Sequence, residues 1–296
     1  MGVMPGVAFV VNGSLVRGGG HLLALCREVA ARHGWRADFL VTEKAEAGVA
    51  AASGAALDGI DMVVAVGGDG TVRGCAEGLA GTGVPLGIVP HGTANLLART
   101  LRVPGHPRAA LTAALHPRGT DRVIDLAVAD GIPFTAMAGM GLDAAVVSAT
   151  KLKHQLGWFA YAMSGAAHLT LPAARFSIKL DGNAPIEREA RSVVVGNSGL
   201  LPGGFSLLPD ARPDDGILDV GTLAPHGPFG WPRLATRVLT HSHHQDRMLE
   251  RFQARRVEVT ASVALPREVD GELVDSSRSL TVTVQPGALT VRMPPL

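Results

Sequence analysis

The sequence has 296 residues, of which 47% are apolar and 18% are charged, enough for one large domain or two modest ones. Its 27 basic and 26 acidic residues leave a formal net charge of +1, and its arginines are scattered. This balance excludes a disordered chain of high charge and argues against a nucleic-acid-binding protein, which needs a basic patch. Cys26 and Cys75 lie far apart without metal-type spacing, so we expect buried thiols in a reducing compartment.

Residues 154–174 form the longest uncharged stretch, and their number would allow a helix to span a bilayer. The stretch also contains histidine, glutamine, serine, threonine and proline, so we do not expect it to span. We favour an ordinary buried or interfacial helix. The alternative is that its aromatic residues Trp158, Phe159 and Tyr161 line an apolar pocket or touch a membrane surface. No basic segment with an apolar core opens the chain, so we expect a cytoplasmic protein without a signal peptide.

In the first 120 residues, short apolar runs alternate with segments of helical spacing. Strands that alternate with helices indicate a parallel sheet covered on both faces, and we therefore expect an open α/β domain. The predicted strands are 7–11, 39–41, 62–66 and 86–89, and the predicted helices are 21–33, 45–57, one that ends at 79 and one that ends near 102.

After residue 122 the pattern changes to short, often alternating apolar runs separated by glycine, proline, asparagine and aspartate. This pattern is typical of an antiparallel sandwich or barrel. We predict an α/β domain over residues 1–122, which the last strand (289–296) could complete, and an antiparallel β-sandwich domain over 123–288. The predicted strands are 123–128, 176–180, 192–195, 217–223, 257–261, 280–284 and 289–292, with helices near 142–171 and 233–251.

A glycine-rich turn follows the apolar run 62–66 and comes directly before helical sequence. Glycines allow close approach of the backbone to a ligand, and a helix N-terminus offers free N–H groups and a positive dipole end, so the turn is suited to bind phosphate. Its spacing differs from that of a Walker loop and of the dinucleotide fingerprint, and a simple tight turn is the alternative. The turn consists of Gly67, Gly68, Asp69, Gly70 and Thr71.

A second turn of this kind follows the apolar run 86–89 and contains Gly92, Thr93 and Asn95. Because parallel strands end at one edge of a sheet, we expect the two turns to converge on one crevice. There, Thr71 would add a hydroxyl donor, and Asp69 would orient a magnesium-bound water or a ribose.

These turns resemble those of the diacylglycerol kinase catalytic-domain family, which includes sphingosine and ceramide kinases. The resemblance continues in family order along nearly the whole chain. The first turn is shared with NAD kinases, whereas the later motifs favour the lipid-kinase branch. The resemblance implies an NAD kinase/phosphofructokinase-like α/β nucleotide domain followed by an antiparallel β-sandwich domain. The later motifs are Ile124-Asp125-Leu126, Gly141-Leu142-Asp143-Ala144, Asn197, Gly203-Gly204, Pro209-Asp210-Ala211, Asp214-Asp215-Gly216-Ile217-Leu218-Asp219 and Asp270-Gly271-Glu272.

The resemblance also implies roles for particular residues. The phosphates of ATP would bind at the first glycine turn, and Asp215 with the carbonyls around it would hold a structural Mg²⁺. Glu272 would be the general base, with Asp270 beside it. The residues that the resemblance places around the nucleotide are Asn12, Ser14, Thr42, Gly67, Gly68, Asp69, Gly70, Thr71, Gly92, Thr93 and Asn95.

A carboxylate base suits this chemistry, because a lipid hydroxyl must lose its proton as it attacks the γ-phosphoryl group, and magnesium neutralises the phosphates. If the segment is extended, Asp270 and Glu272 share one face of a strand. Asp-Gly-Glu is also typical of a hairpin turn, which is the alternative interpretation.

The sequence departs from the family pattern in two places. Asn12-Gly13-Ser14 replaces the usual Asn-Pro followed by a small residue and glycine, and Arg73-Gly74 replaces the usual Asn-Glu. Arg73 could bind phosphate from the first helical turn or be solvated. His241 and His244 would share a helix face, but no third ligand has metal spacing, so we expect a solvated helix end there.

We therefore predict an ATP- and Mg²⁺-dependent lipid kinase that converts diacylglycerol to phosphatidic acid, with the lipid head entering between the domains. One alternative is a kinase of a soluble acceptor such as NAD. Another, suggested by Arg73-Gly74, is a nucleotide- or lipid-binding homologue without catalysis. The near-neutral charge predicts transient, peripheral contact with the inner face of the membrane. A homodimer is compatible with the sequence, which does not decide the oligomeric state.

Overall fold

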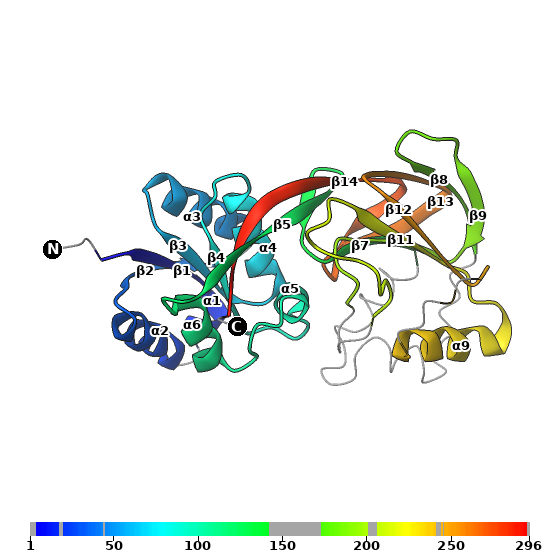
Figure 1. Cartoon of the computed structure of the whole chain (residues 1–296). Helices are drawn as coiled ribbons and strands as arrows, with labels where there is room; N and C mark the ends of the chain where they lie inside the picture. The colour runs from blue at the N-terminus through cyan, green and yellow to red at the C-terminus, as the bar shows by residue number, and fades with distance from the viewer. Residues whose placement is uncertain are drawn as a thin grey trace. The chain divides into compact units, whose positions relative to one another are not determined.

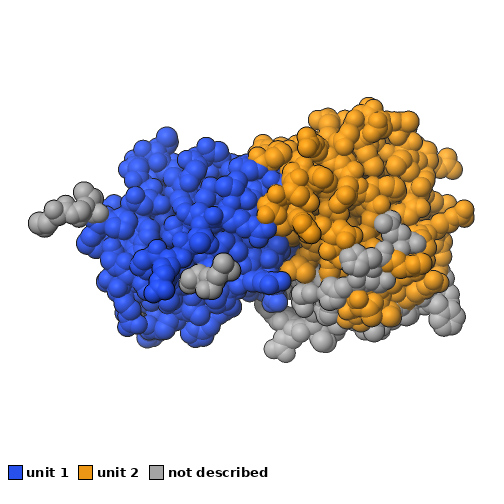
Figure 2. Space-filling model, viewed as in Figure 1, with its two compact units in different colours: residues 1–126, 287–296 blue, residues 127–286 orange. Residues whose placement is uncertain are grey.

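The chain folds into two compact units, which Figure 2 colours separately. Unit 1 comprises residues 1–126 and 287–296, and unit 2 comprises residues 127–286. The chain passes from one unit to the other within two strands, β5 (Thr120–Ala129) and β14 (Glu272–Met293). The computed structural model describes residues 4–17, 20–43, 45–141, 173–200, 206–240, 244 and 246–294.

Unit 1 is built on a parallel sheet. Three of its strands, β1, β3 and β4 (Gly6–Asn12, Met62–Gly67 and Leu86–Pro90), are short and almost wholly apolar, as expected for strands that are buried on both faces. All of them therefore end at the same edge of the sheet. The strand order is β14, β4 (Leu86–Pro90), β3 (Met62–Gly67), β1 (Gly6–Asn12) and β2 (Arg36–Thr42).

Helices cover both faces of this sheet (Figure 1). Alternate residues of β1 show the arrangement, since Val10 packs with Cys75 of α4 (Asp69–Leu79) on one face, while Phe9 packs with Cys26 of α2 (His21–Arg32) on the other. Both cysteines are free and buried, and burial raises the pKa of each thiol to about 12. The helices are α1 (Gly13–Arg17), α2 (His21–Arg32), α3 (Ala45–Leu57), α4 (Asp69–Leu79), α5 (Leu96–Thr100) and α6 (Pro107–Leu115).

Unit 2 is an antiparallel β structure with two apolar clusters. The central strand β10 is buried on both faces, because Val193 and Val195 join one cluster and Val194 joins the other, to which α9 contributes Leu234. Its elements are β6 (Ile132–Phe134), β7 (Met137–Gly141), β8 (Ala174–Leu180), β9 (Ile186–Ala190), β10 (Ser192–Gly196), β11 (Leu218–Leu223), α9 (Gly227–Leu239), β12 (Leu249–Ala254) and β13 (Arg256–Val269).

The predicted fold class is confirmed, an open α/β unit followed by a β unit. Two sequence expectations were wrong in detail. The strands predicted at 280–284 and 289–292 are one strand, β14, which continues through Pro286 and Gly287, where the N–H of Gly287 donates to Asp125 at 2.8 Å. The helix predicted near 233–251 ends at Leu239, and β12 begins at Leu249.

Several sequence features lie outside the described residues. They are the predicted helix near 142–171 with its aromatic patch, the Gly203-Gly204 pair and His241. Among the helices that the structure does describe, none combines the length and apolar character that a membrane span requires.

Candidate active site

The carboxyl edge of the unit 1 sheet collects the residues predicted to surround a nucleotide. Asn12 at the end of β1 pairs with Thr42 at the end of β2, and Gly67 at the end of β3 pairs with Pro90 at the end of β4. Since β1 also pairs with β3, the four strand ends form one continuous edge. This is where an open α/β sheet binds its ligands.

At the β1 end of this edge, Asn12 organises the following turn. Its Oδ1 accepts hydrogen bonds from the N–H of Ser14 at 3.0 Å and from the Ser14 hydroxyl at 2.7 Å. Gly13 lies against the carboxylate of Glu43, which forms an ion pair with Arg17 at 2.7 Å. Thr42 is buried next to this group. The strand end therefore carries a compact set of polar and charged groups.

The two glycine turns lie in direct backbone contact. The N–H of His91 donates to the carbonyl of Gly67 at 2.8 Å. A Cβ atom built on Gly92 would lie 2.6 Å from the Cα of Gly68, a distance that no real side chain tolerates. Glycine is therefore required because two backbones meet here, and the expected convergence of the turns is observed.

Asp69 joins the two turns. One of its carboxylate oxygens accepts the N–H of Asn95 at 2.8 Å, and the other accepts the N–H of Leu96 at 2.6 Å. It thus holds the start of α5, whose free N–H groups need such an acceptor. The sequence predicted that Asp69 faces a magnesium-bound water or a ribose, whereas these contacts give it a part in fixing the loop.

Asn95 stabilises the second turn through two hydrogen bonds to the backbone of Gly92. Its Oδ1 accepts the N–H of Gly92 at 2.9 Å, and its Nδ2 donates to the Gly92 carbonyl at 2.7 Å. Asn95 has a φ of 49°, in the left-handed region that asparagine tolerates better than most residues. Gly92 and Thr93 are left exposed at the surface of this closed loop.

The first turn leads directly into α4, whose N-cap residue is Gly68 and therefore has no capping side chain. Its first-turn N–H groups and the positive end of its dipole are suited to an anionic group. Thr71 is buried, and its hydroxyl lies over Gly67, where a Cβ atom would be 2.4 Å from it. Together the turns form a rigid backbone cradle of the kind that binds phosphate.

Arg73-Gly74 stands where the family usually has Asn-Glu, and helix packing explains why the second of these residues is glycine. Gly74 is buried where α4 meets α3, and a Cβ atom built on Gly48 of α3 would lie 3.7 Å from the Cα of Gly74. The two helices thus approach closely through glycine. Arg73 is half-buried in the first turns of α4.

In unit 2, Asp270 and Gly271 form the two-residue turn between β13 and β14. Their φ angles are 47° and 78°, both positive as in a type I′ hairpin turn, and Val269 pairs with Glu272 across it. The hairpin interpretation of this motif is thus observed. The segment is not extended, so the condition under which the two carboxylates would share one strand face is not met.

Asp270 and Glu272 consequently have different surroundings. Asp270 is buried, and its carboxylate accepts the N–H groups of Thr135, Ala136 and Met137 at 3.0, 2.9 and 3.2 Å. Glu272 is exposed as the first residue of β14. The Asp270 carboxylate is thus a structural anchor that holds three backbone N–H groups, whereas the Glu272 side chain reaches solvent.

The connection between β6 and β7 was not found from the sequence, although two motifs meet on it. The N–H of Asn197 donates to the carbonyl of Ala136 at 2.8 Å, while Asp270 holds the N–H groups from the same segment. Thr135, Ala136 and Met137 take part mainly through backbone atoms, which leave no side-chain pattern to recognise. The one signal in the sequence was Asp270 itself, because a carboxylate that becomes buried needs hydrogen-bond donors.

Asp215 lies in an exposed turn, where its carboxylate accepts the N–H of Ile217 at 3.1 Å. Asp219 lies nearby at the start of β11 and is only 3% exposed. One of its oxygens accepts Gln253 Nε2 at 3.2 Å, and the other is buried without a hydrogen-bond donor among the described residues. Burial, reinforced by Asp215 and Asp210, raises the pKa of Asp219 to about 6.

The described residues contain no cluster of three or more histidine, cysteine, aspartate or glutamate side chains that could hold a metal ion. A cation at Asp215 would therefore need carbonyl or water ligands as well, which Mg²⁺ accepts. The buried oxygen of Asp219, which meets no donor from the part of the chain that the structure describes, is the observation that fits a cation in this region.

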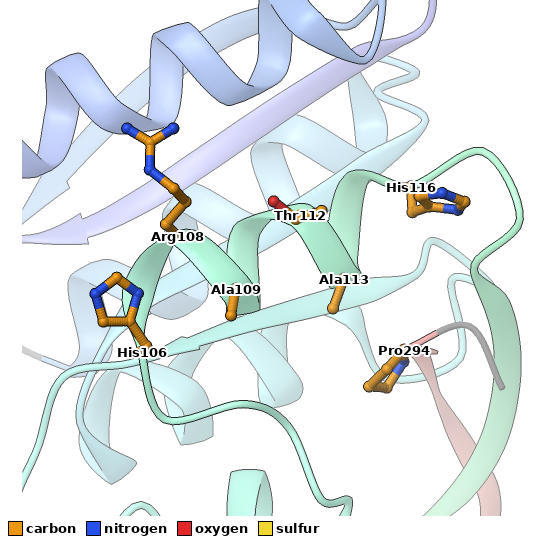
Figure 3. Close-up of a pocket in the computed structure, with 7 residues that line it drawn as sticks. All are labelled: His106, Arg108, Ala109, Thr112, Ala113, His116 and Pro294. Atoms are coloured by element: carbon orange, nitrogen blue, oxygen red, sulfur yellow. The ribbon is translucent and has the colours of Figure 1, made fainter.

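A separate open groove lies along α6 (Figure 3). It is lined by His106, Thr112, His116 and Pro294, and by Arg108, whose guanidinium binds Glu28 at 2.7 and 3.0 Å. None of the predicted site residues lines it, so the groove is not part of the candidate site.

Comparison with known proteins agrees with this arrangement. Residues 7–129 match the diacylglycerol kinase catalytic domain, and residues 136–293 match the YegS C-terminal NAD kinase beta sandwich-like domain. The fold is shared with a crystal structure of a Bacillus anthracis protein assigned as a diacylglycerol kinase (TM-score 0.83, 24% identity, 100% of this chain and 97% of that one). It is also shared with an Archaeoglobus fulgidus NAD kinase in complex with ATP (TM-score 0.56, 14% identity, 96% and 92%).

Two relatives are similar in sequence over most of their length. A Pseudomonas aeruginosa protein described as a probable lipid kinase, YegS-like, is 37% identical over 90% of this chain and 85% of its own. The diacylglycerol kinase of Bacillus subtilis is 32% identical over 75% of this chain and 74% of its own. The expected family is thereby confirmed: the chain belongs to the diacylglycerol kinase family, with the YegS-like lipid kinases, and is a kinase.

Proposed function

We propose that this kinase transfers the γ-phosphoryl group of ATP to the hydroxyl of a membrane lipid, with diacylglycerol as the acceptor and phosphatidic acid as the product. The observation that carries the proposal is the pair of interlocked glycine turns at the carboxyl edge of the unit 1 sheet, tied together by Asp69. Such a cradle of backbone N–H groups binds phosphate by charge and shape.

In this proposal ATP is bound by unit 1. Its phosphates lie on Gly68–Thr71 and the first turn of α4, with Thr93 nearby, and Asn12, Ser14 and Thr42 lie beside the rest of the nucleotide. The NAD kinase with the same fold was solved with ATP, which supports a nucleotide as the ligand of this fold.

Unit 2 supplies the base. Glu272 takes the proton of the lipid hydroxyl, whose oxygen forms a bond to the γ-phosphorus while the bond from that phosphorus to the β-γ bridging oxygen breaks, which releases ADP. Asp270 does not share this task, because its carboxylate holds the N–H groups of residues 135–137. It keeps the turn that presents Glu272 in place.

Magnesium fits the proposal at Asp215, with the buried carboxylate of Asp219 close enough to gain from a cation. Bound magnesium would neutralise negative charge and fix the turn that carries Asp215. The chain's own part is to supply the carboxylates and to hold them through Gln253 and the N–H of Ile217.

A lipid acceptor is favoured over a soluble one by the residues that follow Glu272. Leu273 and Val274 are 40% and 42% exposed, so apolar side chains reach solvent directly beside the proposed base. Acyl chains would cover this apolar surface, whereas NAD would not. The Bacillus subtilis relative, a diacylglycerol kinase, supports the same acceptor class.

The deciding experiment incubates the full chain with γ-labelled ATP, magnesium, NAD and vesicles that contain diacylglycerol and a mixed lipid extract. We expect labelled phosphatidic acid and no labelled NADP. Labelled NADP would establish the soluble-acceptor alternative. Binding of ATP without any labelled product would establish the catalytically inactive one.

The same assay tests the base. Glu272→Gln should lower turnover by about 10²–10⁴-fold while ATP affinity stays the same, because only the proton acceptor is lost. Glu258→Gln is the matched control, since Glu258 lies on β13 in an exposed ion pair with Arg256. Wild-type turnover of the Glu272 variant would remove this residue from the reaction.

A further inference from the structure

The hairpin that carries Glu272 contains a β-bulge close to its turn. Pro266 of β13 pairs with Ser276 of β14, and Glu268 pairs with Leu273. Between these pairs β13 has one residue, Arg267, where β14 has two. A bulge of this kind bends a strand and redirects its side chains. The direction of Glu272 therefore depends on how the bulge is held.

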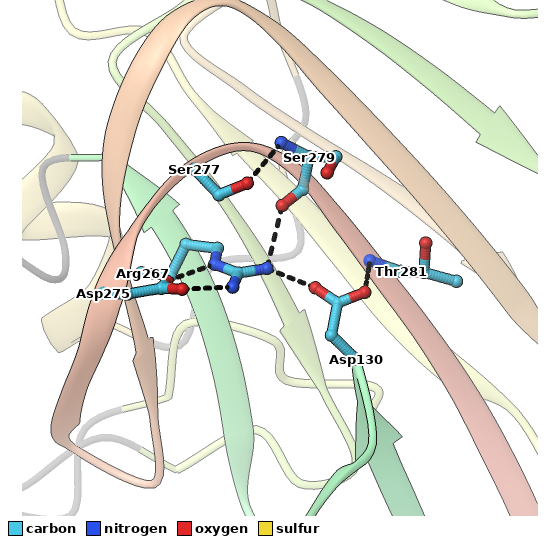
Figure 4. A network of polar contacts seen from close by, with 6 residues as sticks. All are labelled: Asp130, Arg267, Asp275, Ser277, Ser279 and Thr281. Atoms are coloured by element: carbon cyan, nitrogen blue, oxygen red, sulfur yellow. Dashed lines mark hydrogen bonds and ion pairs between the residues drawn. The ribbon is translucent and has the colours of Figure 1, made fainter.

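Arg267 spans this bulge (Figure 4). Its guanidinium binds both oxygens of Asp275, one of the two β14 residues opposite it, at 2.7 and 2.8 Å, and donates to the carbonyl of Ser279 at 2.9 Å. The Arg267 side chain is only 13% exposed. A planar guanidinium that binds a carboxylate through two parallel hydrogen bonds fixes both position and orientation.

The same guanidinium reaches a third segment. It bonds to Asp130, the first residue of the turn between β5 and β6, whose other oxygen accepts the N–H of Thr281 at 3.1 Å. The N–H of Asp130 in turn donates to the Thr281 carbonyl at 2.9 Å. The bulge is thus tied to a neighbouring hairpin as well as to its own strand.

A second contact holds the turn itself. Glu268, adjacent to Arg267, is 2% exposed, and its Oε2 accepts the N–H of Gly271 at 2.7 Å. Arg267 therefore fixes the bulge on one side of Glu272, while Glu268 fixes the turn on the other side.

We propose that Arg267, with Asp275 and Asp130 as its partners, is a positioning residue that sets the direction of the Glu272 carboxylate. This inference rests on the proposed role of Glu272 as the base. Arg267 acts on the reaction only through Glu272, and its contribution is a fixed strand geometry.

The test compares Arg267→Lys and Asp275→Asn with the wild type in the lipid kinase assay. Lysine keeps the charge but cannot bind two oxygens in a fork, so we expect kcat to fall about tenfold or more with KM for ATP unchanged. Arg256→Lys is the matched control, because Arg256 lies on the same strand in an exposed pair with Glu258, and it should keep wild-type kinetics.

A double-mutant cycle separates positioning from general loss of stability. In the Glu272→Gln background, Arg267→Lys should have almost no further effect on turnover, since the group that it positions is gone. The same fold-loss in both backgrounds would overturn the proposal. Wild-type turnover of Glu272→Gln alone would instead refute the base, which keeps the two failures distinguishable.

Amide hydrogen exchange supplies a readout that does not need catalysis. Arg267→Lys and Asp275→Asn should speed exchange at residues 269–274 and leave residues 192–196 of β10 protected. Unchanged exchange around Glu272 in both variants would overturn the proposal, whichever acceptor the kinase uses. Faster exchange throughout unit 2 would mean a purely structural role and would overturn it as well.

Discussion

The carboxylate of Asp69 accepts the backbone N–H of Asn95 at 2.8 Å, so the aspartate of one glycine turn fixes the start of the helix that follows the other. Its second oxygen accepts the N–H of Leu96 at 2.6 Å. The two turns therefore cannot move independently. A phosphate bound by one turn would benefit from the rigidity of both, because the donors are ordered before the ligand arrives.

Asp69→Ala should uncouple the turns. We expect a loss of about 1–2 kcal/mol in the free energy of unfolding, as for other lost helix caps, and at least a tenfold weaker affinity for ATP by titration calorimetry. Asp61→Ala is the matched control, since Asp61 accepts the N–H of Gly6 at 2.7 Å at the opposite edge of the same sheet. It should lose stability but keep its ATP affinity, and equal affinities in the two variants would contradict the coupling.

Gly92→Ala should disrupt the same contact from the backbone side. Its Cβ atom would lie 2.6 Å from the Cα of Gly68, so the turns must separate, and we expect ATP binding to be lost in a chain that still folds. Gly105→Ala is the control, because a Cβ atom there meets nothing within 4 Å. Calorimetry with both variants checks this, and ATP binding by the Gly92 variant would show that the close approach is dispensable.

Much of unit 1 could be predicted from the sequence, because each apolar run ends at an asparagine, threonine, glycine or proline that stops the strand. Gly67 and Gly92 could be placed at one edge for this reason. Their direct contact could not, since a glycine has no side chain whose type reveals its neighbour. The role of Asp69 was missed likewise, because its partners are backbone N–H groups that every residue carries.

In unit 2 the sequence predicted the strands but not the tertiary hydrogen bonds between their connections. Asp-Gly occurs three times as a turn with positive φ at both residues, at Asp130, Asp181 and Asp270. Only Asp270 has a buried carboxylate that holds the N–H groups of another connection. Local sequence predicts the turn in all three cases. It does not predict which aspartate is buried, because the partners of Asp270 lie more than 130 positions away.

Asp219→Asn tests the magnesium proposal. In EDTA near pH 8 this variant should be at least as stable as the wild type, because it no longer buries a charged carboxylate, one oxygen of which meets no donor among the described residues. Magnesium at 100 times its Kd should add about 2.7 kcal/mol to the free energy of unfolding of the wild type and so raise its Tm. It should have little effect on the Tm of the variant.

Two further variants complete this test. Asp215→Asn should also lose the response to magnesium, whereas Glu187→Gln, which alters an exposed carboxylate of β9, should respond like the wild type. If magnesium raises the Tm of both aspartate variants as much as that of the wild type, the cation does not bind at Asp215 and Asp219.

Asp246 should make the stability of unit 2 sensitive to acid. Arg237 of α9 binds both of its oxygens, at 2.8 and 2.7 Å, and with the N–H of Met248 holds the pKa of Asp246 well below its ordinary value of 3.8. A lowered carboxyl pKa stabilises the fold above pH 3.8, and this stabilisation is lost as the pH falls toward the folded-state value.

Asp246→Asn should therefore cost about 1–3 kcal/mol at pH 7 and show a smaller loss of Tm than the wild type between pH 5 and about pH 2.5. Glu258→Gln, in an exposed ion pair, should change Tm little, and parallel acid profiles for Asp246→Asn and the wild type would show that this ion pair does not control the acid response.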